Sequence, residues 1–122
     1  MLKILAIALG GAVGALARYW LTGTVNALIG HNFPYGTLFV NVLGSLTLGL
    51  CFVWFVERAG VPSEIRFGVM VGLLGALTTF STFSLETFVL LDGGRLGAGL
   101  LNVATSVVLC VAGCWLGILA AR

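Results

Sequence analysis

The sequence predicts an all-helical integral membrane protein with four transmembrane helices, of which the third is broken near its middle. Hydrophobic residues make up 60% of its 122 positions and charged residues only 8%, whereas soluble domains carry about 25% charged residues. Charge-free runs extend over residues 4–17, 19–56, 67–85 and 96–121. Four crossings fit, because a span needs roughly 20 mostly apolar residues. Six hydroxyl residues gather between Thr78 and Thr87, a pattern that favours neither lipid nor a continuous helix.

The whole chain, residues 1–122, is expected to form a single four-span membrane domain. The segments between the spans are too short to build a soluble core, so no enzymatic activity is expected. The net charge of +2 is too small and too scattered for nucleic-acid binding, which needs clustered basic residues. Cys51, Cys110 and Cys114 lie in apolar runs without metal-ligand spacing, so we expect them to be buried as small hydrophobic side chains.

The first span runs from about residue 3 to residue 28 and is expected to be retained, because no convincing cleavage site follows its apolar run. Gly10, Gly14 and Arg18 are spaced by four and share one helix face. The glycines are expected to pack against a neighbouring helix. Arg18 either attracts anions in a vestibule, pairs with Glu86 or reaches the lipid headgroups, and its position in the sequence does not decide between these roles.

The second span covers about residues 37–56 and follows a connection, residues 30–36, that is rich in turn-forming residues. Asn41 lies near the start of this span and shares a face with Gly44 and Ser45. Its carboxamide is expected to serve either as a hydrogen-bonded link between helices or as a group that binds a ligand.

The third span covers about residues 65–91, and Ser63 is expected to cap its helix. Gly75 loosens the turn before the hydroxyl run, so we expect a local break in the helix. Non-helical backbone at this depth must be buried in protein or line a cavity. Carbonyl groups freed by such a break can coordinate a hard cation, and Gly75 and Thr78 are the candidates.

Two aromatic rings follow the expected break. Phe80 and Phe83 are three residues apart and are therefore expected to project in roughly the same direction. The edge of an aromatic ring carries partial positive charge. Two rings presented edge-on would attract an anion, and the hydroxyl groups of Ser81, Thr82 and Ser84 would replace part of its hydration shell. The alternative is that both rings only pack against a neighbouring helix.

The fourth span covers about residues 96–121 and carries a mildly polar stripe at every fourth position. The stripe consists of Asn102, Ser106, Cys110 and Cys114. Small polar groups spaced in this way either hold helices together or line a pathway for an ion.

The distribution of basic residues bears on topology. Short loops make neighbouring helices antiparallel, so both termini and the middle loop lie on one side. That side carries Lys3, Arg58, Arg66 and Arg122, and the other carries Arg95. The bias toward cytoplasmic termini is small, so insertion in both orientations, and with it an antiparallel homodimer, is expected.

Three motifs resemble those of the Fluc family of fluoride channels. They are GGAVGALARY at residues 10–19, GTLFVNVLG at residues 36–44 and GLLGALTTFSTF at residues 72–83. The resemblance covers all four spans and implies a multi-pass protein of the bacterial inner or plasma membrane. The implied function is passive, fluoride-selective export that lowers cytoplasmic fluoride. The implied assembly is a dual-topology homodimer with two pores and a structural sodium ion at its centre.

The motif matches also imply site residues in this chain. The implied fluoride pathway consists of Asn41, Phe80, Ser81, Thr82, Phe83 and Ser106. Arg18 matches the arginine at the end of the first motif and is the implied vestibule charge. The carbonyl groups of Gly75 and Thr78 are the implied sodium ligands. Cys110 is left out of the pathway, because a thiol is a weaker donor than the hydroxyl that some relatives have there.

Two other functions fit a short four-span chain. A proton-coupled exporter of the small multidrug-resistance type depends on a carboxylate within the first span. Here the first span has no acidic residue, and Glu86 lies late in the third. A purely structural membrane subunit would explain the glycines but would leave the polar third span without a role.

Overall fold

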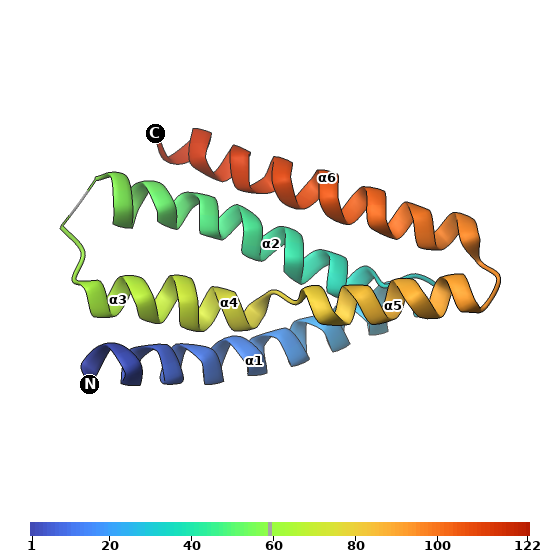
Figure 1. Ribbon diagram of the computed structural model, residues 1–122, viewed down its shortest axis with the longest axis horizontal. Helices are drawn as coiled ribbons and strands as arrows, with labels where there is room; N and C mark the ends of the chain where they lie inside the picture. Colours follow the sequence, from blue (N-terminus) through green and yellow to red (C-terminus); the bar gives the residue numbers. More distant parts are fainter. Residues whose placement is uncertain (59) are drawn as a thin grey trace.

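The computed structural model describes residues 1–58 and 60–122 and is all-helical over them (Figure 1). In this part of the chain four helical stretches are long and apolar enough to cross a membrane, which confirms the predicted architecture. They are Leu2–Ile29, Tyr35–Glu57, Ser63–Asp92 and Leu96–Ala121. Successive stretches run in opposite directions, so both termini lie at the same end of the bundle (Figure 1). That the whole chain forms one domain stays a prediction.

Helix α1 (Leu2–Ile29) packs against the first half of the third span through glycine. A Cβ added at Gly10 would collide with the carbonyl oxygen of Gly68, and one added at Gly14 would collide with that of Leu73. Lipid is as apolar as the side chains it would replace, so close packing of this kind is what holds membrane helices together. The expectation that these glycines form a packing face is confirmed.

Helix α2 (Tyr35–Phe52) packs against α6 (Leu96–Ala121) in the same way. A Cβ at Gly49 would collide with the carbonyl oxygen of Cys114, and one at Gly117 with that of Leu46. The two helix pairs meet at a small apolar core. It consists of Val40, Cys51, Leu74 and Leu77. The core therefore lies directly beside the middle of the third span.

The end of the bundle that holds the termini is tied together by ionic and main-chain contacts. Arg122 forms a salt bridge with Glu57 at 2.6 Å, and this carboxylate raises the pKa of the arginine. Arg58 donates a hydrogen bond to the carbonyl oxygen of Ala121. Residue 59, which falls in the connection expected after the second span, lies outside the described residues.

The third span is a series of short helices with a bend (Figure 1). In order they are α3 (Ser63–Phe67), a π-helical segment (Gly68–Leu73), α4 (Leu74–Leu77) and α5 (Phe80–Asp92). Ser63 is the first residue of α3, so its predicted role as cap is wrong. Pro62 occupies the cap position with ψ 141° and leads straight into the helix. The expected interruption of the third span is found at Thr78 and Thr79.

Candidate ion-binding site

The break in the third span arises from two threonines in extended conformation. Thr78 ends α4 with ψ 155°. Its main-chain N–H and its hydroxyl group both donate to the carbonyl oxygen of Leu74, at 3.1 and 3.0 Å. Thr79 follows with φ −152° and ψ 112° and caps α5, because its hydroxyl oxygen accepts a hydrogen bond from Thr82 N at 3.2 Å. The Thr79 hydroxyl thus takes the place of a main-chain acceptor at the break, and the Thr78 hydroxyl adds a second bond to the Leu74 carbonyl.

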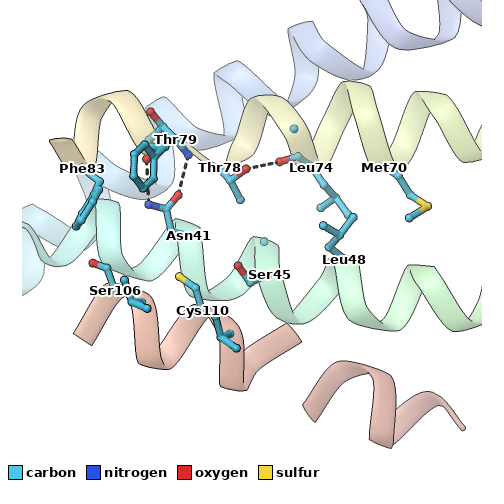
Figure 2. Close-up of a pocket in the computed structure, with 15 residues that line it drawn as sticks. Asn41, Ser45, Leu48, Met70, Leu74, Thr78, Thr79, Phe83, Ser106 and Cys110 are labelled. Atoms are coloured by element: carbon cyan, nitrogen blue, oxygen red, sulfur yellow. Dashed lines mark hydrogen bonds between the residues drawn. The ribbon is translucent and has the colours of Figure 1, made fainter. Parts of the chain in front are cut away.

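Asn41 on α2 joins this break to the rest of the bundle (Figure 2). Thr79 N donates to Asn41 Oδ1 at 2.7 Å, and Asn41 Nδ2 donates to Thr79 O at 3.1 Å. Only one orientation of the carboxamide satisfies both bonds, since the main-chain N–H can only donate and the carbonyl can only accept. Asn41 therefore does link two helices, the first of the two roles expected for it.

A cavity of about 360 Å³ opens beside the break. Asn41 and Ser45 on α2, Thr79 and Phe83 on the third span, and Ser106 on α6 line it (Figure 2). The carboxamide of Asn41 has two N–H groups and uses one for Thr79. Asn41 lines this cavity, and among the described residues its second N–H has no acceptor.

The two phenylalanines after the break contact each other, with ring centroids 5.2 Å apart and ring planes at 46°. Both rings line the cavity, as their spacing predicts. Phe83 is only 8% exposed, whereas Phe80 is 77% exposed on the outer surface of the chain. One ring is therefore held by the bundle, and the other is available to a neighbouring molecule or to lipid.

A chain of hydrogen bonds fixes the α6 side of the cavity. Thr87 donates to the carbonyl oxygen of Phe83 at 2.7 Å and accepts from Asn102 Nδ2 at 2.9 Å. Ser106 lies 3.4 Å from the Asn102 carboxamide oxygen. Asn102 is 1% exposed and acts as a link between helices. Cys110, which the sequence analysis left out of the pathway, lines the cavity beside Ser106 (Figure 2).

A second cavity, of about 420 Å³, lies on the other side of the break. Arg18 of α1 lines it together with His31 and Thr82. Thr79 lines both cavities and separates them. Its hydroxyl group donates to the hydroxyl of Thr82 at 2.9 Å and lies 3.3 Å from that of Ser81, which is exposed.

The structure decides against one of the roles considered for Arg18. Glu86, its alternative partner, accepts a hydrogen bond from Thr37 at 2.8 Å instead. Within residues 1–58 and 60–122 the other oxygen of Glu86 is buried without a hydrogen-bond partner. Arg18 faces a cavity whose described lining contains no carboxylate, an arrangement that suits an anion.

Thr79 is the site residue that sequence reasoning missed. It is one of six hydroxyl residues in a short run, and its type does not distinguish it from the others. What sets it apart is its pairing with Asn41, 38 residues away. The capping spacing of Thr79 and Thr82 is the one sequence signal that would have pointed to it.

Comparison with known proteins identifies relatives along the full chain. A family model described as "CrcB-like protein, Camphor Resistance (CrcB)" matches residues 5–118. The fluoride-specific ion channel FluC of Geobacter metallireducens is 52% identical over 122 residues, which are 100% of this chain and 98% of the relative. FluC of Magnetococcus marinus is 50% identical over 121 residues, 99% of this chain and 98% of the relative. FluC of Citrifermentans bemidjiense is 48% identical over 122 residues, again 100% and 98%.

Proposed function

Because this chain belongs to the CrcB/FluC family, we propose that it is a fluoride-selective ion channel that exports fluoride passively and lowers its cytoplasmic concentration. The observation that carries the proposal is the 52% identity over the full chain to a fluoride-specific ion channel. The protein is a multi-pass membrane channel and not an enzyme. Its residues bind the ion weakly enough to release it and need not alter any covalent bond.

The proposed fluoride pathway runs between the two cavities. Arg18 attracts the anion into the larger cavity, and the exposed Ser81 and the cavity-lining Thr82 offer hydroxyl donors beside the break. On the other side the free N–H of Asn41 and the hydroxyl of Ser106 are the donors. These groups replace part of the hydration shell of fluoride, which is the requirement for conduction through a narrow pore.

Phe80 and Phe83 are the proposed aromatic part of this pathway. Their edges carry partial positive charge and attract a small anion without binding it tightly. The 5.2 Å separation of the rings lets one ion contact both in turn. Phe80 is 77% exposed in the single chain, which supports a pathway completed by a second copy.

The proposed assembly is an antiparallel, dual-topology homodimer. Large apolar side chains are exposed on the outer faces of α1 and α6, including Trp20 and Trp115, and lipid or a second copy must cover them. Cysteine labelling from each side of the membrane, on a variant with one loop cysteine, tests this. Labelling from both sides supports dual insertion, and labelling from one side alone contradicts it.

The proposed sodium ion binds the carbonyl groups of Gly75 and Thr78. Gly75 lies in α4, the last turn before the break, and Thr78 lies in the break itself, where the helix no longer uses every carbonyl. Carbonyl oxygens are the ligands that a hard cation prefers. Bound there, the ion would supply positive charge beside the break.

Fluoride efflux from proteoliposomes, followed with a fluoride electrode, tests the proposal. Phe83→Ile and Phe80→Ile are expected to lower efflux at least about tenfold, because they remove the ring edges, while the assembly stays intact. Chloride-loaded liposomes are the control. Unchanged fluoride efflux in both variants would refute the pathway. Efflux that required an imposed proton gradient would instead favour the small multidrug-resistance type of exporter.

A further inference from the structure

Two side chains at the break take up N–H groups that a continuous helix would use. In an α-helix each N–H donates to the carbonyl four residues earlier. Thr79 N–H would therefore bond to Gly75 O, and Thr82 N–H would bond to Thr78 O. In the structure Thr79 N donates to Asn41 Oδ1 at 2.7 Å, and Thr82 N donates to Thr79 Oγ1 at 3.2 Å. The carbonyl groups that lose these two donors, those of Gly75 and Thr78, are the ones proposed to bind sodium.

We propose that Asn41 and Thr79 create the cation site as positioning residues. The carboxamide of Asn41 releases the carbonyl of Gly75 from the helix, and the hydroxyl of Thr79 releases that of Thr78. Neither side chain need touch the cation. The inference rests on the proposed function, since it concerns the same sodium ion, and it explains why these carbonyls are available.

The energetics of buried backbone support this assignment. A carbonyl group without a partner at membrane depth is costly, because no water replaces the lost hydrogen bond. Thr79 is only 7% exposed, whereas Thr78 is half-buried and Gly75 is exposed in the single chain, and both line the cavity beside the break. The two side-chain hydrogen bonds satisfy the N–H groups and leave the carbonyl oxygens to be satisfied by something else. A hard cation meets that need.

The two positioning residues differ in what else they contact. Asn41 keeps one N–H on the wall of the smaller cavity, so a substitution there alters both the cation site and the anion pathway. The hydroxyl of Thr79 can be removed without disturbing the bonds between Asn41 and the Thr79 main chain. The Thr79 hydroxyl also donates to the Thr82 hydroxyl on the proposed pathway, so both variants are assessed by their response to sodium and not by fluoride efflux.

The experiment measures the stability of the purified, full-length protein against sodium concentration. Thermal unfolding is followed in sodium chloride and in N-methyl-D-glucamine chloride at equal ionic strength. Thr79→Val keeps the shape of the side chain and removes the hydroxyl, whereas Thr79→Ser keeps the hydroxyl. Thr47→Val is the matched control, because within residues 1–58 and 60–122 the Thr47 hydroxyl bonds only the Leu43 carbonyl of its own helix. Asn41→Leu tests the Gly75 carbonyl in the same way. It also takes the place of Thr79→Val if that variant yields no folded protein.

Sodium is expected to raise the unfolding temperature of the unmodified protein, because a ligand of the folded state stabilises it. In Thr79→Val and Asn41→Leu the sodium concentration for half of this effect should rise about tenfold, because the N–H group that the side chain had bound can bond the carbonyl again, and one hydrogen bond accounts for a change of about this size. Thr79→Ser and Thr47→Val should respond as the unmodified protein does. An unchanged sodium response in Thr79→Val or, where that variant does not fold, in Asn41→Leu would overturn the inference. Indifference of the unmodified protein to sodium would overturn the proposed sodium site as well, while leaving fluoride conduction to its own assay.

Discussion

The close packing of α1 against the third span predicts how strongly a substitution at Gly14 should destabilise the protein. Gly14 lies where α1 approaches the main chain of the third span. An added Cβ would collide with the Leu73 carbonyl oxygen and would lie 2.9 Å from the Leu73 carbonyl carbon and 3.1 Å from the Ala76 Cβ. Two of these neighbours are backbone atoms, so no side-chain rotation relieves the contact. We expect Gly14→Ala to force the helices apart.

The loss of stability caused by this collision can be separated from the gain in helix propensity that alanine brings. Relief to an ordinary contact of about 3.5 Å requires a shift of roughly 1 Å between the helices. Overpacking of this kind costs about 1–3 kcal/mol. Gly23→Ala on the same helix is the matched control, because a Cβ there meets nothing within 4 Å. That variant should gain about 0.5–1 kcal/mol from the loss of glycine flexibility.

Unfolding by sodium dodecyl sulfate in mixed micelles, followed by the fluorescence of the three tryptophans, measures this difference. Gly14→Ala should be less stable than Gly23→Ala by about 1–3 kcal/mol, which is the overpacking cost, because the gain in helix propensity is common to both variants. Fluoride efflux should fall with it, because Leu73 precedes Leu74, whose carbonyl anchors Thr78. Equal stability of the two variants would refute the close packing on which the position of the break depends.

Three further predictions concern the buried hydrogen bonds of α6 and the walls of the two cavities. Thr87→Val leaves the buried Asn102 carboxamide without its acceptor and should cost about 1–3 kcal/mol in thermal unfolding, whereas Thr87→Ser should cost less because it keeps the hydroxyl. A small methanethiosulfonate reagent that modifies Cys110, a residue lining the smaller cavity, should block fluoride efflux. Cys110→Ser should abolish the block, and a block that persists in this variant would contradict the position of Cys110 on the cavity wall. Arg18→Gln should lower fluoride conductance at low ionic strength. The difference in conductance from the unmodified protein should vanish near 1 M salt, where the screening length is about 3 Å. A lower conductance that does not depend on salt would contradict an electrostatic role of Arg18.

Much of the architecture follows from the sequence, because the bilayer restricts the choices. Long charge-free runs predict the four helical stretches, and the hydroxyl run after Gly75 predicts the break. Two π-helical segments, Val53–Glu57 at the end of the second span and Gly68–Leu73 in the third, are not predicted by the sequence, since the wider turn has no distinct residue pattern. Ser63 shows the limit of local rules, because Pro62 already fixes the entrance to the helix and the serine becomes its first residue.

The sequence predicts which residues belong to the candidate site better than it predicts which of them form hydrogen bonds with one another. Asn41 was singled out, but its partner could not be, because the pairing with Thr79 depends on how α2 and the third span pack. The same holds for Arg18, whose alternative partner Glu86 bonds to Thr37 instead. Residue spacing defines a shared helix face, but it does not define which face of another helix lies opposite.

The central claim is that this chain forms a passive channel selective for fluoride. Current recorded across a planar bilayer containing the purified protein, with a tenfold fluoride gradient and equal chloride on both sides, tests it directly. A passive fluoride channel gives a current that reverses at the fluoride equilibrium potential, about 59 mV for a single charge. The reversal should not move when a chloride or proton gradient is imposed. Absence of fluoride current, or a reversal potential that follows chloride or protons, would contradict the account.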